Sequence, residues 1–177
     1  MTQWRVSQGD ILDTDADGLI CSANPSLNLS GGVGGAFLLR YGLSMQEFLH
    51  EYLRSSQRRF VEPGEAVLAP PCGSRFKAVT HAVAIDALYE TNDVWIRAAY
   101  ESAFRQLAAA SCKSIAAACL GCGYGKYPVE RFIESIRLLA ANSIAGVEVV
   151  TLVTTNSDLA GALSKIVEAA GGAEENG

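Results

Sequence analysis

Short apolar runs alternate with segments of helical periodicity along this chain of 177 residues. Val, Ile and Thr are frequent in several of the runs, as is typical of strands. Residues 82–85 and 149–153 are almost continuously apolar, which favours strands covered on both faces. The alternation predicts an α/β fold, with helices on both sides of a sheet. The expected strands are residues 4–6, 18–21, 66–69, 78–85, 114–119 and 147–153, and the expected helices are residues 36–41, 44–53, 94–111, 128–140 and 157–170.

The length fits a single domain, which we assign to residues 1–170. About half of the residues are apolar, enough for a sizeable core. The small, acidic residues 171–177 are expected to form a disordered tail. No apolar run reaches the length of a membrane span, and the N-terminus lacks the layout of a signal peptide. We therefore expect a cytoplasmic monomer with no membrane partner.

The cysteines and the net charge narrow the possible functions. An odd number of cysteines, five, argues against a disulfide framework. Cys119 and Cys122 have the spacing of a metal or redox pair, but no second pair completes a zinc site. We predict Cys119 in a buried strand and Cys122 in a loop, with no bond between them, and no metal or cofactor. The net charge of −5 argues against a dedicated nucleic-acid-binding protein.

Two glycine-rich segments, residues 30–36 and 120–125, each follow an apolar run and precede a helical pattern. Glycine lets backbone N–H groups approach an anion closely, and a helix N-terminus adds partial positive charge. In α/β sheets, ligands bind at the carboxyl ends of the strands, where both segments fall. Together they predict a ligand whose two phosphates lie between them.

Three polar residues on or beside the expected strands have two interpretations each. Asp10 can accept a hydrogen bond from an exocyclic amine such as that of adenine, or it can cap a short turn. Asn24, which Pro25 makes extended, can bind a ribose hydroxyl and hold the following loop, or it can form an Asx-type turn. His81 lies within an expected strand and is either a core histidine with its hydrogen bonds satisfied, which we favour, or a catalytic histidine.

The order of these features resembles the macrodomain family. The resemblance rests on Gly9-Asp10-Ile11, on a strand ending in Ala23-Asn24-Pro25-Ser26-Leu27, and on Gly31-Gly32-Val33 opening a helix. Residues 63–67, 79–83 and 120–128 are similar to later motifs of the family, so that the likeness covers residues 3–169. It implies a three-layer α/β/α sandwich with a mixed, mostly parallel central sheet of about six strands.

The resemblance also implies that the chain binds ADP-ribose or ADP-ribosylated substrates, with an ADP-ribosylated protein or nucleic acid as a partner. Asp10 and the backbone of Ile11 would hold adenine, and Asn24 would contact the distal ribose. The first glycine segment would surround the distal ribose and one phosphate through Gly31, Gly32, Val33 and Gly34. The second would surround the diphosphate through Gly121, Cys122, Gly123, Tyr124 and Gly125.

The sequence departs from the family pattern at the catalytic positions. Many hydrolytic members have Asn-Ala-Ala-Asn where this chain has Cys21-Ser22-Ala23-Asn24, and an aspartate where it has Gly34. Glycine cannot take or orient a proton. The expected hydrolysis of ADP-ribosyl or O-acetyl-ADP-ribose groups is therefore weak, with Asn24 as the remaining catalytic candidate.

The residues expected on the adenine side of the site depart from the family pattern as well. Residues 154–156 stand where many members carry an aromatic residue that stacks on the base, and Phe132 or Trp95 is a candidate substitute.

Two other functions remain open at this point. One is a cysteine-dependent hydrolase, in which Cys122 near a helix N-terminus has a lowered thiol pKa and the glycine loops form an oxyanion hole. The other is a protein- or RNA-interaction module in which the loops are purely structural.

Overall fold

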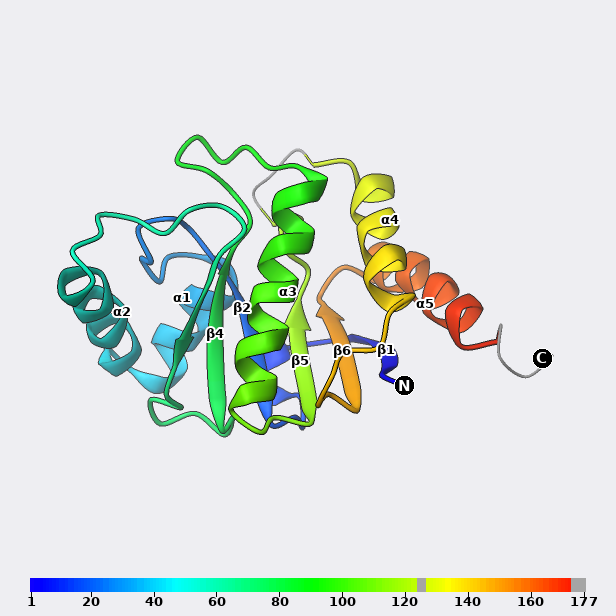
Figure 1. Ribbon diagram of the computed structural model, residues 1–177, viewed down its shortest axis with the longest axis horizontal. Coiled ribbons are helices and arrows are strands. Elements are labelled where there is room, and N and C mark those ends of the chain that lie inside the picture. Colours follow the sequence, from blue (N-terminus) through cyan, green and yellow to red (C-terminus); the bar gives the residue numbers. More distant parts are fainter. Residues whose placement is uncertain (124–126, 173–177) are drawn as a thin grey trace.

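A computed structural model describes residues 1–123 and 127–172 of the chain (Figure 1). All six predicted strands are present, each within a few residues of its expected bounds. They are β1 (Gln3–Gln8), β2 (Gly18–Ala23), β3 (Ala66–Ala69), β4 (Ala78–Val83), β5 (Ser114–Ala118) and β6 (Val149–Thr154). Pro25 follows the end of β2 closely, as its effect on the preceding residue predicts.

The strands form one sheet in the order β1-β6-β5-β2-β4-β3. Every neighbouring pair is parallel except β3, which runs antiparallel to β4 at one edge. The predicted mixed, mostly parallel sheet is thus confirmed. Because the five parallel strands point the same way, their carboxyl ends meet along one edge of the molecule.

Five α-helices connect the strands. They are α1 (Gly32–Tyr41), α2 (Ser44–Ser55), α3 (Asp93–Ala109), α4 (Val129–Ala140) and α5 (Ser157–Gly172), with a short 3-10 helix at Ile11–Asp13. Two expectations were wrong at the ends of helices. Helix α1 begins at Gly32 rather than Ala36, so most of the first glycine segment is its first turn. Helix α5 continues through Gly171 and Gly172, which were expected in the disordered tail, while residues 173–177 lie outside the described part.

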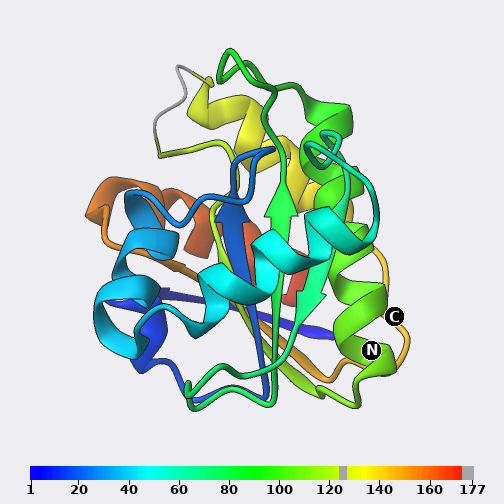
Figure 2. The same ribbon diagram turned by 90° about the vertical axis from the view of Figure 1, so that its left-hand side faces the viewer.

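The helices cover both faces of the sheet (Figures 1 and 2). Helices α3, α4 and α5 pack on one face around Tyr100, Phe104 and Phe132, and α1 and α2 pack on the other around Phe37 and Met45. The fold is therefore the three-layer α/β/α sandwich that the sequence predicts. Among the helices described, none is long and apolar enough to cross a membrane.

Candidate functional site

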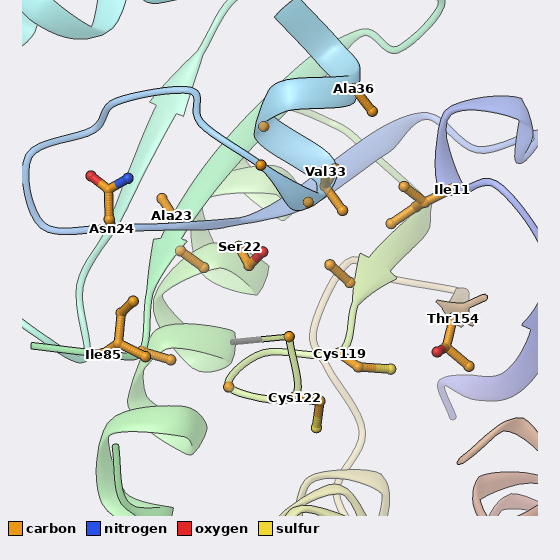
Figure 3. Close-up of a pocket in the computed structure, with 18 of the residues that line it drawn as sticks. Ile11, Ser22, Ala23, Asn24, Val33, Ala36, Ile85, Cys119, Cys122 and Thr154 are labelled. Carbon is orange, nitrogen blue, oxygen red and sulfur yellow. The ribbon is translucent and has the colours of Figure 1, made fainter. Parts of the chain in front are cut away.

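A cavity of about 1280 Å³ lies at the carboxyl ends of the parallel strands. Each of these strands contributes residues to its wall (Figure 3). Residues 9–11 follow β1, residues 154–156 follow β6, residues 118–123 end and follow β5, residues 22–24 end β2, and residues 84–85 follow β4. Among the predicted site residues, the cavity is lined by Asp10, Ile11, Asn24, Gly31, Gly32, Val33, Gly34, Gly121, Cys122 and Gly123. Tyr124 and Gly125 lie outside the described residues.

The first turn of α1 lines the cavity. Gly31 and Gly32 have φ values of 64° and 50°, a conformation that favours glycine. No side chain caps this end of the helix, and Gly32, Val33 and Gly34 all line the cavity. The first N–H groups of a helix have no partner within the helix, and they bear its partial positive charge. This turn is thus arranged to bind an anion.

The loop that leads into α1 is held in place by two side chains. Asn24 donates from Nδ2 to the carbonyl of Asn28 at 2.8 Å and accepts at Oδ1 from the N–H of Asn28 at 3.1 Å. Gln46 on α2 accepts from the N–H of Leu29 at 2.7 Å and donates to the carbonyl of Leu27 at 2.9 Å. Both ends of the Asn24 amide are thus engaged within the loop, as the loop-holding part of its interpretation predicts, while its contact with a ribose hydroxyl stays a prediction. Sequence reasoning missed Gln46, since nothing in an amphipathic helix distinguishes a loop-holding glutamine.

The two described glycines of the second segment have different reasons to be glycine. Gly121 has a φ of 78°, and a Cβ there would lie 3.3 Å from Ile96 Cδ1. The fold itself therefore requires glycine at position 121. Gly123 has no such φ, and a Cβ built on it meets nothing within 4 Å. The packing of the fold therefore does not require glycine at position 123. The lack of a side chain there leaves open space beside the cavity.

The carboxylate of Asp10 is both a cap and a member of an ion-pair cluster. Its Oδ1 accepts from the N–H of Leu12 at 2.9 Å, as the capping interpretation predicts. Its Oδ2 lies 2.7 Å from Nη2 of Arg40, whose Nη1 lies 2.7 Å from Asp13 Oδ1. Arg40 thus ties helix α1 to the turn that follows β1. A carboxylate has about four acceptor positions, so these bonds leave room for one more donor from the cavity.

The cysteine-dependent mechanism loses its chemical basis in the structure. Cys122 lies in a loop, seven residues before helix α4 begins at Val129, and so not at the N-terminus of the helix that follows it. Burial raises the pKa of Cys122 to about 12, and the expected lowering of this pKa is wrong. Cys119 lies just beyond β5 and is only partly exposed rather than buried within the strand, so its predicted place in a buried strand is wrong. Burial of its thiol likewise raises the pKa of Cys119 to about 12. Both thiols are free, as predicted.

No described aromatic side chain lines the β1–β6 end of the cavity. Phe132 is fully buried in the core under α3 and α4, so it cannot stack on a ligand. Trp95 does not line the cavity. The two candidate substitutes for the missing aromatic residue are therefore wrong. Tyr89 and Tyr127, which sequence reasoning missed, are the aromatic residues among the described lining, and Tyr89 belongs to the β4 end.

Gly34 is packed against the loop that precedes α1. A Cβ at this position would lie 3.3 Å from Cδ2 and 3.4 Å from Cα of Leu29, which is itself buried. A side chain at position 34 thus requires Leu29 and its backbone to move. The close contact gives glycine at this position a packing reason that the sequence did not reveal.

His81, on β4, lines the cavity and is completely buried. Neither ring nitrogen has a hydrogen-bond partner among the described residues, so the prediction of a satisfied histidine is wrong. Cys21 is its register partner on β2, at a position where hydrolytic family members have asparagine. Burial lowers the pKa of His81 from 6.5 to about 4, so the folded protein holds the ring neutral.

We expect His81 to make stability depend on pH. The unfolded chain binds a proton at His81 below about pH 6.5, whereas the folded protein does not until about pH 4. Stability is therefore fully present above pH 6.5 and falls by about 2 kcal/mol between pH 7 and pH 4.5. Urea unfolding at a series of pH values checks this against His81→Leu, which keeps a similar volume and removes the titration. Parallel curves for the two proteins would show that His81 is not the source.

Comparison with known proteins identifies the family. The Macro domain family model matches residues 20–136. The chain belongs to the macro domain family. Among curated relatives, an uncharacterized protein of Thermoplasma volcanium is 30% identical over 129 residues, covering 71% of this chain and 68% of that protein. An uncharacterized protein of Mycobacterium tuberculosis is 26% identical over 130 residues, and the matched part is 34% of its length. This macro domain thus spans about a third of the mycobacterial relative.

Solved macrodomains share the fold. The Oceanobacillus iheyensis macrodomain with ADP superimposes with a TM-score of 0.80 at 17% identity, over 93% of this chain and 89% of that one. A Trypanosoma brucei macrodomain in complex with ADP-ribose gives a TM-score of 0.76 at 19% identity, over 93% of this chain and 69% of that one. Within the described residues, no group of three or more His, Cys, Asp or Glu side chains is placed to hold a metal ion.

Proposed function

We propose that this macro domain binds ADP-ribose, free or attached to a carrier, in the cavity at the strand ends. The observation that carries the proposal is the uncapped first turn of α1, which lines the cavity together with Cys119 and Gly121–Gly123 of the loop after β5. Two sets of backbone donors on opposite walls fit a diphosphate, because each phosphate then has donors of its own. The family relationship and the volume of the cavity, about 1280 Å³, both support this ligand.

The polar residues suggest how the ligand lies. Asp10, after β1, would accept from the adenine amine, while Ile11 contributes apolar surface beneath the base. The diphosphate would lie between Gly32–Gly34 and Gly121–Gly123, and the distal ribose would lie toward Asn24 and the end of β4. The bonds of Asp10 to Leu12 and Arg40 do not compete with this role, because they fix the carboxylate while leaving acceptor capacity unused.

Calorimetric titration tests the proposed ligand directly. ADP-ribose is expected to bind more tightly than ADP, and ADP more tightly than AMP, because each adds a group that the cavity can contact. The order of the three affinities is the decisive result, because a basic surface without a specific site would bind the three nucleotides according to their charge alone. If ADP-ribose gives no heat of binding at millimolar concentration, or if AMP binds equally well, the proposed function is wrong.

A further inference from the structure

Tyr89, in the loop between β4 and α3, has a φ of 62°. Bulky residues rarely adopt this left-handed conformation, because the Cβ approaches the backbone closely, and residues that do so cluster at ligand sites. Burial in the core does not account for it, since 53% of the Tyr89 side chain is exposed. Within residues 1–123 and 127–172, four other non-glycine residues have a positive φ. Of these, Leu27 is completely buried, while Gln57, Cys72 and Ser111 do not line the cavity.

Asp86 holds the loop in this conformation. Its Oδ1 accepts from the N–H groups of Leu88 at 2.8 Å and Glu90 at 2.9 Å. Its carbonyl accepts from the N–H of Tyr89 at 3.1 Å, and its own N–H donates to the carbonyl of Glu90 at 3.0 Å. Thr91 closes the base of the loop with a hydrogen bond to the carbonyl of Ala84. The loop thus presents Tyr89 in one fixed position despite the cost to its backbone.

Tyr89 lines the cavity from the loop that follows β4, and in the sheet β4 is separated from β1 by β6, β5 and β2. Ile85 lies in the same loop, whereas Ile11 follows β1 and Thr154 ends β6. Figure 3 shows Ile85 beside Ala23 and Asn24, with Ile11 and Thr154 on the opposite side. A ligand whose adenine lies at Asp10 and whose phosphates lie between the glycine segments therefore extends its last group toward Tyr89.

We propose that Tyr89 contacts the distal ribose and selects ligands that carry this sugar over those that end at the diphosphate. A tyrosine ring offers an apolar face to the C–H groups of a sugar and a hydroxyl to its polar edge. The inference rests on the proposed function, and it assigns to the loop after β4 a part in recognition that the glycine segments do not supply.

Tyr89→Gly and Tyr89→Ala test the proposal together. Both variants are expected to bind ADP-ribose about three- to tenfold more weakly, while their affinity for ADP changes by less than about twofold. Glycine also relieves the backbone strain that alanine retains, so the melting temperature of Tyr89→Gly should exceed that of Tyr89→Ala by about 2–5 °C. A residue that merely supports the fold would move both affinities equally.

Two other residues supply matched controls. Leu88 is 81% exposed and does not line the cavity, so Leu88→Ala should leave both affinities unchanged. Ser111 has a φ of 61° at the end of α3, away from the cavity, so Ser111→Gly should raise the melting temperature without affecting binding. Equal losses of ADP and ADP-ribose affinity in the Tyr89 variants, or no loss of either, would overturn the contact. If the wild-type protein binds neither ligand, it is the proposed function that fails.

Discussion

Gly123→Glu is expected to abolish binding of ADP-ribose while leaving the fold intact. A Cβ at position 123 meets nothing within 4 Å, and the backbone there needs no left-handed conformation, so the fold does not exclude a side chain at this position. The same open space is where the diphosphate would lie. A carboxylate within about 4 Å of a phosphate is repelled by roughly 1–4 kcal/mol per charge at effective dielectric constants between water and a protein surface. Together with the lost volume, this corresponds to at least a hundredfold loss of affinity.

Gly161→Glu is the matched control for this charge. Gly161 is exposed on α5, does not line the cavity, and also has nothing within 4 Å of its Cβ position. The control should therefore bind ADP-ribose like the wild-type protein in the same calorimetric titration, and thermal melts should show that both variants are folded. Normal binding by a folded Gly123→Glu protein would remove the second glycine segment from the ligand site.

Turnover is expected to be about 10²–10⁴-fold slower than in hydrolytic members of the family. That range is what a positioned general acid or base typically contributes, and Gly34 offers none. Both ends of the Asn24 amide are hydrogen-bonded to the backbone of Asn28, so its side chain holds the loop in place. Release of ADP-ribose from an aspartyl or glutamyl ester, followed beside an active macrodomain, checks this rate. A rate equal to that of the active enzyme, and unaffected by Asn24→Ala, would mean that the catalytic groups lie elsewhere.

Restoring the missing aspartate should not restore the rate by itself. In Gly34→Asp the new Cβ would approach Leu29 to 3.3 Å, so the loop must shift before the carboxylate can be placed. We expect this variant to melt at a lower temperature than the wild-type protein, with little gain in hydrolysis. The replacement of aspartate by glycine is thus coupled to the packing of the loop before α1.

Most of the strands and helices could be predicted from the sequence, because the patterns that indicate them lie within short segments of the chain. Runs such as Val149–Val153 show continuous apolar character, and glycines next to apolar runs indicate the strand ends where ligands bind. The start of α1 was misplaced because glycine has low helix propensity, which the N-terminal position of Gly32 and the packing of Gly34 override. The lack of hydrogen-bond partners for His81 among the described residues could not be predicted, because it depends on which side chains approach the ring from strands that are distant in sequence. Tyr89 was missed because no pattern signals a left-handed tyrosine.

The pairing of β1 with β6 has a consequence for how the protein is made. Residues far apart in the sequence form the adenine side of the proposed site, where Gly9, just after β1, donates to the carbonyl of Thr154, at the end of β6, at 3.0 Å. At the amino ends of the same two strands, Thr2 Oγ1 donates to the carbonyl of Val147 at 3.0 Å. During synthesis, both glycine segments leave the ribosome well before Val149–Thr154 does. Non-local pairings of this kind form late, because a long loop must close first. A nascent chain would therefore acquire the proposed phosphate-binding walls before it acquires the proposed place for the base.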